Sequence, residues 1–73
     1  MPRAAERPRT LFVNGDITET DVPTLAALVE SLGFAEAQVA TAVNGEFVAR
    51  GQRAATLLGD GDKVEIVAPR QGG

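Results

Sequence analysis

The most regular apolar pattern in the chain covers residues 22–32. Its five apolar members follow one another at spacings of three, three, one and three, which places them on one face of a helix. The pattern therefore predicts an amphipathic helix over residues 22–32 that buries this face. The residues of the face are Val22, Leu25, Leu28, Val29 and Leu32.

The residues around this pattern suit the two ends of a helix. Asp21 can accept hydrogen bonds from the free N–H groups of the first turn, and Pro23 stands where a missing N–H costs nothing. Gly33 follows the last periodic residue and can adopt the left-handed conformation of a C-cap. We expect the helix to begin after Asp21 and to end before Gly33.

The pair Asn14-Gly15 predicts a β-hairpin, because both residue types tolerate the positive φ of a two-residue type I′ turn. The strands on either side are expected at residues 10–13 and 16–20. Ile17 is the one strong apolar residue of the second strand, which is typical of an edge strand kept polar against aggregation. Asn44-Gly45 predicts a second hairpin, with strands at residues 39–43, whose alanines can lie under the helix, and 46–50.

Residues 53–58 are expected to form a short helical turn that buries one of its two leucines. Residues 59–62, Gly-Asp-Gly-Asp, predict a tight turn into a last strand at residues 63–68. Val64 and Ile66 share one face of this strand, because alternate residues of a strand point the same way.

The elements follow the order β-β-α-β-β-β. This order predicts an α+β roll, in which a mixed sheet of four to five strands packs on one helix. We expect the strand after the helix to return beside the first strand in a right-handed crossover. One helix covers one face of a sheet, so the other face is left to solvent or to a partner.

Composition narrows the classes of function. The chain has 73 residues and contains neither Cys nor His, which removes thiolates, the usual general base and the commonest metal ligand. We therefore expect no catalytic site. The formal charge of −3 argues against a nucleic-acid partner. No apolar run has the roughly 20 residues of a membrane span, and the N-terminus lacks the apolar core of a secretory signal, so we expect a cytoplasmic protein.

The two ends are interpreted as extensions of a domain at residues 10–68. Residues 1–9 hold two prolines and three arginines without periodicity, which indicates a disordered extension. Residues 69–73 are expected to be a flexible tail that ends in Gly72-Gly73. Because glycine lets a backbone pass where no Cβ would fit, the Gly73 carboxylate can be threaded into the narrow active site of another protein. An acidic patch on that protein can guide Arg70.

Three further groups of residues are candidate sites. Asp60 and Asp62 lack the other oxygens of a calcium loop, so we interpret them as turn residues. Arg50, Arg53 and Lys63 are scattered charges that are typical of a solvated face. The third group is Phe12, Phe47 and Val67, which we expect on the sheet face away from the helix. There the three side chains either form an apolar docking patch or are covered by loops.

Several segments together resemble one family. They are the run Val-Asn-Gly-Glu-Phe-Val at residues 43–48 with Arg50 after it, the run Gly-Asp-Gly-Asp-Lys-Val-Glu-Ile-Val at residues 59–67, and the terminal Gly72-Gly73. With these segments and the element order β-β-α-β-β-β, the chain resembles the ThiS-type sulfur carrier proteins of bacterial thiamin biosynthesis, which share the β-grasp fold of ubiquitin. The resemblance covers roughly residues 9–73.

The resemblance implies a carrier rather than an enzyme. In the family, an ATP-dependent adenylating enzyme of the ubiquitin-activating type activates the terminal glycine carboxylate. Sulfur from a cysteine desulfurase or another donor then replaces AMP, and the thiocarboxylate is passed to thiazole synthase. Carried over to this chain, the sulfur attaches at Gly73, while Gly72, Gln71 and Arg70 thread into the partner. The resemblance implies no cofactor bound by the carrier itself, since ATP and magnesium belong to the activating enzyme. No membrane partner is expected, because no apolar run is long enough to span a membrane.

Two features depart from the family pattern. The N-terminal extension is longer than usual, and Gln71 stands where many members carry a third glycine or a small residue. Other interpretations stay open at this point: the small subunit of molybdopterin synthase, a carrier for another sulfur acceptor, a protein modifier joined through Gly73, or a β-grasp interaction domain with an inert tail.

Overall fold

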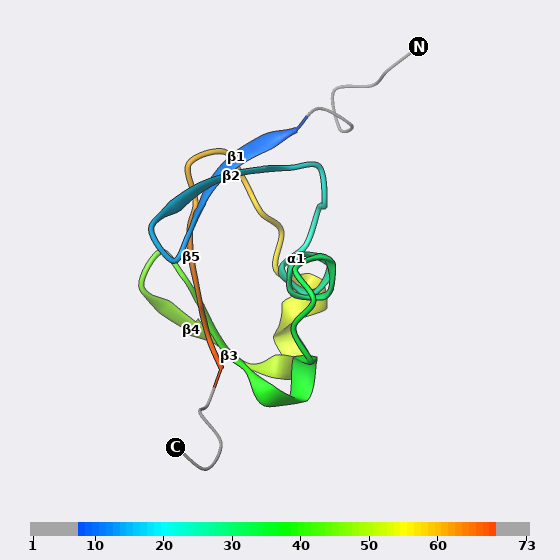
Figure 1. Cartoon of the computed structure of the whole chain (residues 1–73). Coiled ribbons are helices and arrows are strands. Elements are labelled where there is room, and N and C mark those ends of the chain that lie inside the picture. Colours follow the sequence, from blue (N-terminus) through cyan, green and yellow to red (C-terminus); the bar gives the residue numbers. More distant parts are fainter. Residues whose placement is uncertain (1–7, 69–73) are drawn as a thin grey trace.

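A five-stranded mixed sheet forms one layer of the fold, and the helices lie together on one side of it (Figure 1). The computed structural model describes residues 8–68, so most of the predicted extension and the whole predicted tail lie outside the described residues. The element order confirms the predicted α+β class. The elements are β1 (Arg9–Val13), β2 (Asp16–Thr20), α1 (Leu25–Ser31), η2 (Glu36–Gln38), β3 (Ala40–Val43), β4 (Glu46–Val48), η3 (Arg50–Ala55) and β5 (Lys63–Val67), where η marks a 3-10 helix.

The last strand occupies the centre of the sheet, whose order is β2-β1-β5-β3-β4. β5 pairs parallel with β1 and antiparallel with β3. The expectation that the strand after the helix returns beside the first is therefore wrong, because β5 takes that place. The reason is burial: β5 contributes two buried apolar side chains, Val64 and Ile66, whereas the fully buried residue of β3 is Thr41.

Both predicted hairpin turns are confirmed. Asn14 and Gly15 have φ values of 51° and 86°, and Asn44 and Gly45 have 53° and 85°, as a type I′ turn requires. β2 has its predicted bounds and lies at a sheet edge, but β4 ends at Val48, before the predicted residue 50.

The alanines of β3 do not lie under the helix. Ala40 is exposed, because the register turns Thr41 toward the core instead.

The helix begins later than predicted. Thr24, rather than Asp21, is the N-cap of α1, and its hydroxyl accepts a hydrogen bond from the N–H of Ala27 over 3.2 Å. The segment before it is extended and pairs with residues 56–58, where the N–H of Leu58 donates to the carbonyl of Pro23 over 3.0 Å. This pairing keeps residues 22–24 out of the helix.

The end of α1 is as predicted. Gly33 has a φ of 86°, and its N–H donates to the carbonyl of Glu30. The N–H of Phe34 donates to the carbonyl of Val29 over 3.2 Å, which completes a Schellman motif. Within residues 8–68, no helix has the length and apolar character needed to cross a membrane.

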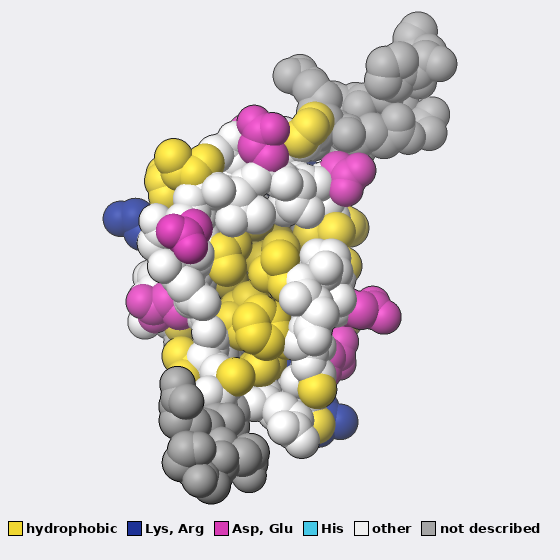
Figure 2. All heavy atoms as spheres, in the orientation of Figure 1, with side chains coloured by type: hydrophobic (Ala, Val, Ile, Leu, Met, Phe, Trp, Pro, Cys, Tyr) yellow, Lys and Arg dark blue, Asp and Glu magenta, His cyan; other side chains and the backbone are white. Residues whose placement is uncertain are grey.

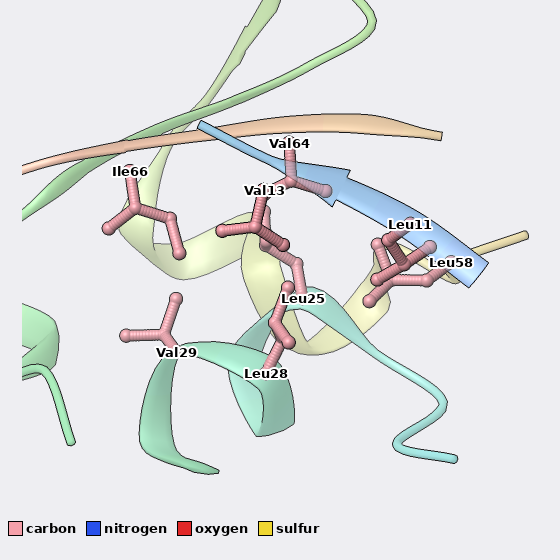
Figure 3. Close-up of a cluster of buried hydrophobic side chains, with 8 residues drawn as sticks. All are labelled: Leu11, Val13, Leu25, Leu28, Val29, Leu58, Val64 and Ile66. Atoms are coloured by element: carbon pink, nitrogen blue, oxygen red, sulfur yellow. The ribbon is translucent and has the colours of Figure 1, made fainter. Parts of the chain in front are cut away.

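The core lies between the sheet and α1, and eight buried apolar side chains form it (Figure 3). Leu58 is buried and Leu57 is 75% exposed, which settles the choice between the two leucines. Burial of each such side chain stabilises the fold by about 1.5–3 kcal/mol. Figure 2 shows hydrophobic side chains between the two layers, bordered by more acidic than basic groups. The eight are Leu11, Val13, Leu25, Leu28, Val29, Leu58, Val64 and Ile66.

Candidate functional site

The strand that leads to the predicted tail occupies the centre of the sheet. Arg70, Gln71, Gly72 and Gly73 lie outside the described residues, which end at the exposed Ala68. β5 precedes this point and has a neighbouring strand on each side. The position of β5 therefore determines where the tail leaves the domain.

Each of the two Asn-Gly turns binds β5 through the asparagine side chain. The carboxamide of Asn14 accepts from the N–H of Ile66 over 2.9 Å and donates to the carbonyl of Ile66 over 3.1 Å. The carboxamide of Asn44 accepts from the N–H of Lys63 and donates to a carboxylate oxygen of Asp62, each over 3.0 Å. The sequence predicts a turn at each asparagine but not these contacts. The presence of Asn, rather than Gly or Asp, at both positions was the sequence feature that could have indicated these side-chain hydrogen bonds.

The carboxylates of the turn before β5 bind backbone N–H groups. Asp60 accepts from the N–H of Thr10 over 2.8 Å, and Asp62 accepts from the N–H of Gly59 over 2.8 Å. The first contact joins the turn to the start of β1, and the second closes the turn itself, in agreement with the predicted turn. In the described part of the chain, no three His, Cys, Asp or Glu residues gather as a metal site would need.

The three residues of the predicted docking patch lie on the sheet face opposite α1. Phe47 is 73% exposed and Val67 is 62% exposed, whereas Phe12 is half-buried. They do not form one surface. Phe12 lies on β1 and Phe47 on β4, with β5 and β3 between them, a separation of about 14 Å.

Charged residues of β5 divide the apolar part of this face. Lys63 is the register partner of Phe12, and Glu65 is the register partner of Ala42, which in turn faces Phe47. Cross-strand partners point to the same face, so the exposed Lys63 and Glu65 separate two apolar groups. The N-terminal group is Phe12 with Ile17, and the tail-side group is Phe47, Ala42, Ala40 and Val67.

A hollow of about 350 Å³ lies beside the point where the described chain ends. Val67 of β5 forms one side of it, and the segment from η2 into β3 forms the other. Two residues of the tail-side group line it, so the hollow continues that apolar surface. Its lining is Ala37, Gln38, Val39, Ala40 and Val67.

A buried arginine binds the segment that lines one side of this hollow. Arg53 is 2% exposed, and its guanidinium donates to the carbonyls of Glu36 over 2.7 Å and of Val39 over 2.6 Å. The expectation that Arg53 belongs to a solvated face is therefore wrong, because three oxygen acceptors replace water around it. Arg50 and Lys63 are exposed as expected. Nothing in the sequence distinguishes Arg53 from Arg50.

Comparisons with known proteins agree with this geometry. The model of the ThiS family matches residues 6–73. The chain is 34% identical to a thiamine biosynthesis protein (ThiS) from Geobacter metallireducens, whose crystal structure superposes with a TM-score of 0.73 over 88% of this chain and 99% of that one. A solution structure of a thiamine biosynthesis protein from Geobacter metallireducens gives the same identity and TM-score over 88% and 87%. No match was found among curated proteins.

Proposed function

The chain belongs to the ThiS family, a family of sulfur carriers of thiamin biosynthesis that are not themselves enzymes, and from this premise we propose that Gly73 carries the sulfur. In the proposed reaction, a carboxylate oxygen of Gly73 attacks the α-phosphorus of ATP and releases pyrophosphate, which leaves an acyl adenylate. A sulfur nucleophile then attacks the acyl carbon and AMP leaves. Hydrosulfide gives the thiocarboxylate directly, whereas a persulfide gives an acyl disulfide that a thiol must reduce.

The observation that carries this proposal is the extent of the family match, which reaches Gly73 and includes Gly72. The composition supports it. Adenylation is needed because a carboxylate is a poor electrophile, and a chain without Cys or His offers neither a thiolate nor an imidazole base. We therefore assign ATP and magnesium to a separate adenylating enzyme.

The partners in this proposal are an adenylating enzyme, a sulfur donor such as a cysteine desulfurase, and thiazole synthase as acceptor. Five extended residues, 69–73, span at most about 17 Å, enough for Gly73 to reach the bottom of a cleft while the domain stays outside. The tail-side group of apolar residues lies next to the origin of this segment and is the proposed docking surface. Phe12 lies apart from it, beyond Lys63 and Glu65.

The experiment that tests the role of Gly73 blocks its carboxylate. One alanine is added after Gly73, and the matched control carries one alanine before Met1. ATP–pyrophosphate exchange by the host's activating enzyme is then measured with each chain. The proposal expects exchange with the control at the level of the unmodified chain and none with the variant extended after Gly73. Equal exchange with both chains would contradict it.

A further inference from the structure

The parallel ladder between β1 and β5 stops before β5 does. The last register pair joins Val13 to Val64, and the N–H of Asn14 then donates to the carbonyl of Val64 over 2.8 Å. At Asn14 the chain turns away toward β2, while β5 continues to Val67. The backbone of β1 therefore has no residue to pair with Ile66.

The side chain of Asn14 takes the place of that missing residue. Its carboxamide carries one acceptor and one donor, and these bind the N–H of Ile66 over 2.9 Å and the carbonyl of Ile66 over 3.1 Å. A residue of an antiparallel strand makes the same two bonds with its own N–H and C=O. Because the Ile66 side chain is only 4% exposed, an unpaired backbone at this position would be costly.

We propose that Asn14 is a positioning residue for the C-terminal tail. This inference rests on the proposed function of Gly73. Two bonds to one residue fix the orientation of the Ile66 backbone, immediately before Val67 and Ala68 lead into residues 69–73. Without Asn14 the end of β5 is held by β3 alone and separates from the sheet more readily, and each separated residue must be ordered again when the tail enters a partner. Asn14 thus lowers the cost of docking without touching the reacting carboxylate.

Asn44 provides a matched control within the same chain. It also begins an Asn-Gly turn with positive φ at both residues, and its carboxamide also makes two hydrogen bonds. Those bonds end on Asp62 and Lys63, at the start of β5 and away from the tail. Replacement of either asparagine by Gly preserves the turn, since glycine readily adopts positive φ, and removes two side-chain bonds.

The test compares Asn14→Gly with Asn44→Gly in two measurements. The first is amide hydrogen exchange of Ile66, which we expect to be at least about tenfold faster in Asn14→Gly and unchanged in Asn44→Gly. The second is thiocarboxylate formation by the host's activating enzyme with ATP, magnesium and sodium sulfide. We expect Asn14→Gly to raise KM about five- to tenfold at unchanged kcat, and Asn44→Gly to leave both constants unchanged.

The outcomes separate the inference from the proposed function. A KM that is unchanged in Asn14→Gly, or raised equally in both variants, would overturn the positioning role, because the effect would then be absent or a general loss of stability. Slow exchange of Ile66 in Asn14→Gly would overturn it as well. If the unmodified chain forms no thiocarboxylate, the proposed function fails, while the exchange measurement still decides whether Asn14 anchors the end of β5.

Discussion

The guanidinium of Arg53 donates from Nε to the hydroxyl of Thr41 over 3.0 Å, and both side chains are 2% exposed. The same hydroxyl donates to the carbonyl of Val48 over 2.8 Å. With the carbonyls of Glu36 and Val39, these contacts link η3 to η2, β3 and β4. A buried cation is tolerated here because its donors find neutral oxygens in place of water.

We expect Arg53→Met to lower the free energy of unfolding by about 2–4 kcal/mol, because two carbonyls and one hydroxyl lose their donor inside the domain. Urea unfolding followed by circular dichroism measures this. The matched control is Arg50→Met in the same 3-10 helix, where the side chain is exposed and the change should stay within about 0.5 kcal/mol. Equal effects of the two substitutions would contradict the role of Arg53.

The position of the N-cap predicts different effects of two nearby substitutions. Thr24→Ala removes the hydroxyl that accepts from Ala27 and should destabilise the domain by about 1 kcal/mol. Asp21→Ala should have little effect, because Asp21 lies three residues before the N-cap. Thermal unfolding of both variants distinguishes them. A larger loss in Asp21→Ala would mean that the helix begins where the sequence pattern placed it.

The helix also offers a matched pair of leucines. Leu28 is fully buried, whereas Leu32 is 42% exposed although both belong to the predicted apolar face. Leu28→Ala should cost about 2–5 kcal/mol, since it leaves a cavity against the sheet. Leu32→Ala should cost clearly less in the same unfolding experiment. Similar losses at the two positions would show that the apolar face extends beyond the end of α1.

A substitution in the tail-side group should weaken binding to a partner without destabilising the domain, because these side chains lie on the surface. Phe47→Ala should weaken binding to the activating enzyme about tenfold, as expected for an aromatic contact in an interface. Ile17→Ala on the same sheet face is the control: Ile17 is 72% exposed and Phe47 73%, but Ile17 belongs to the other apolar group. Titration calorimetry gives both affinities. A stronger effect of Ile17→Ala would move the interface to the N-terminal group.

The local elements could be predicted from the sequence because their causes are local. The Asn-Gly turns need positive φ at two adjacent residues, and Gly33 needs it at the end of α1, so the residue types alone locate them. The alternation of Val64 and Ile66 likewise located the buried face of β5. The family resemblance then gave the β-grasp fold, which the comparisons confirm.

The features that the sequence did not reveal depend on distant residues. The helix start was wrong because residues 22–24 pair with residues 56–58. The burial of Arg53 was missed because its acceptors lie 12 to 17 positions away along the chain. The central place of β5 depends on its pairing with both β1 and β3, which lie far from it in the sequence, and the alternation of Val64 and Ile66 indicates its buried face but not its neighbours.

Intact mass spectrometry tests the sulfur-carrier role of Gly73 most directly. The chain is incubated with ATP, magnesium, a cysteine-derived sulfur source and the host's activating enzyme, beside a variant that lacks Gly73. We expect a mass gain equal to the exchange of one oxygen for one sulfur in the full chain and no gain in the variant. No gain in the full chain, with an enzyme shown to be active, would contradict the sulfur-carrier role and favour an interaction domain with an inert tail.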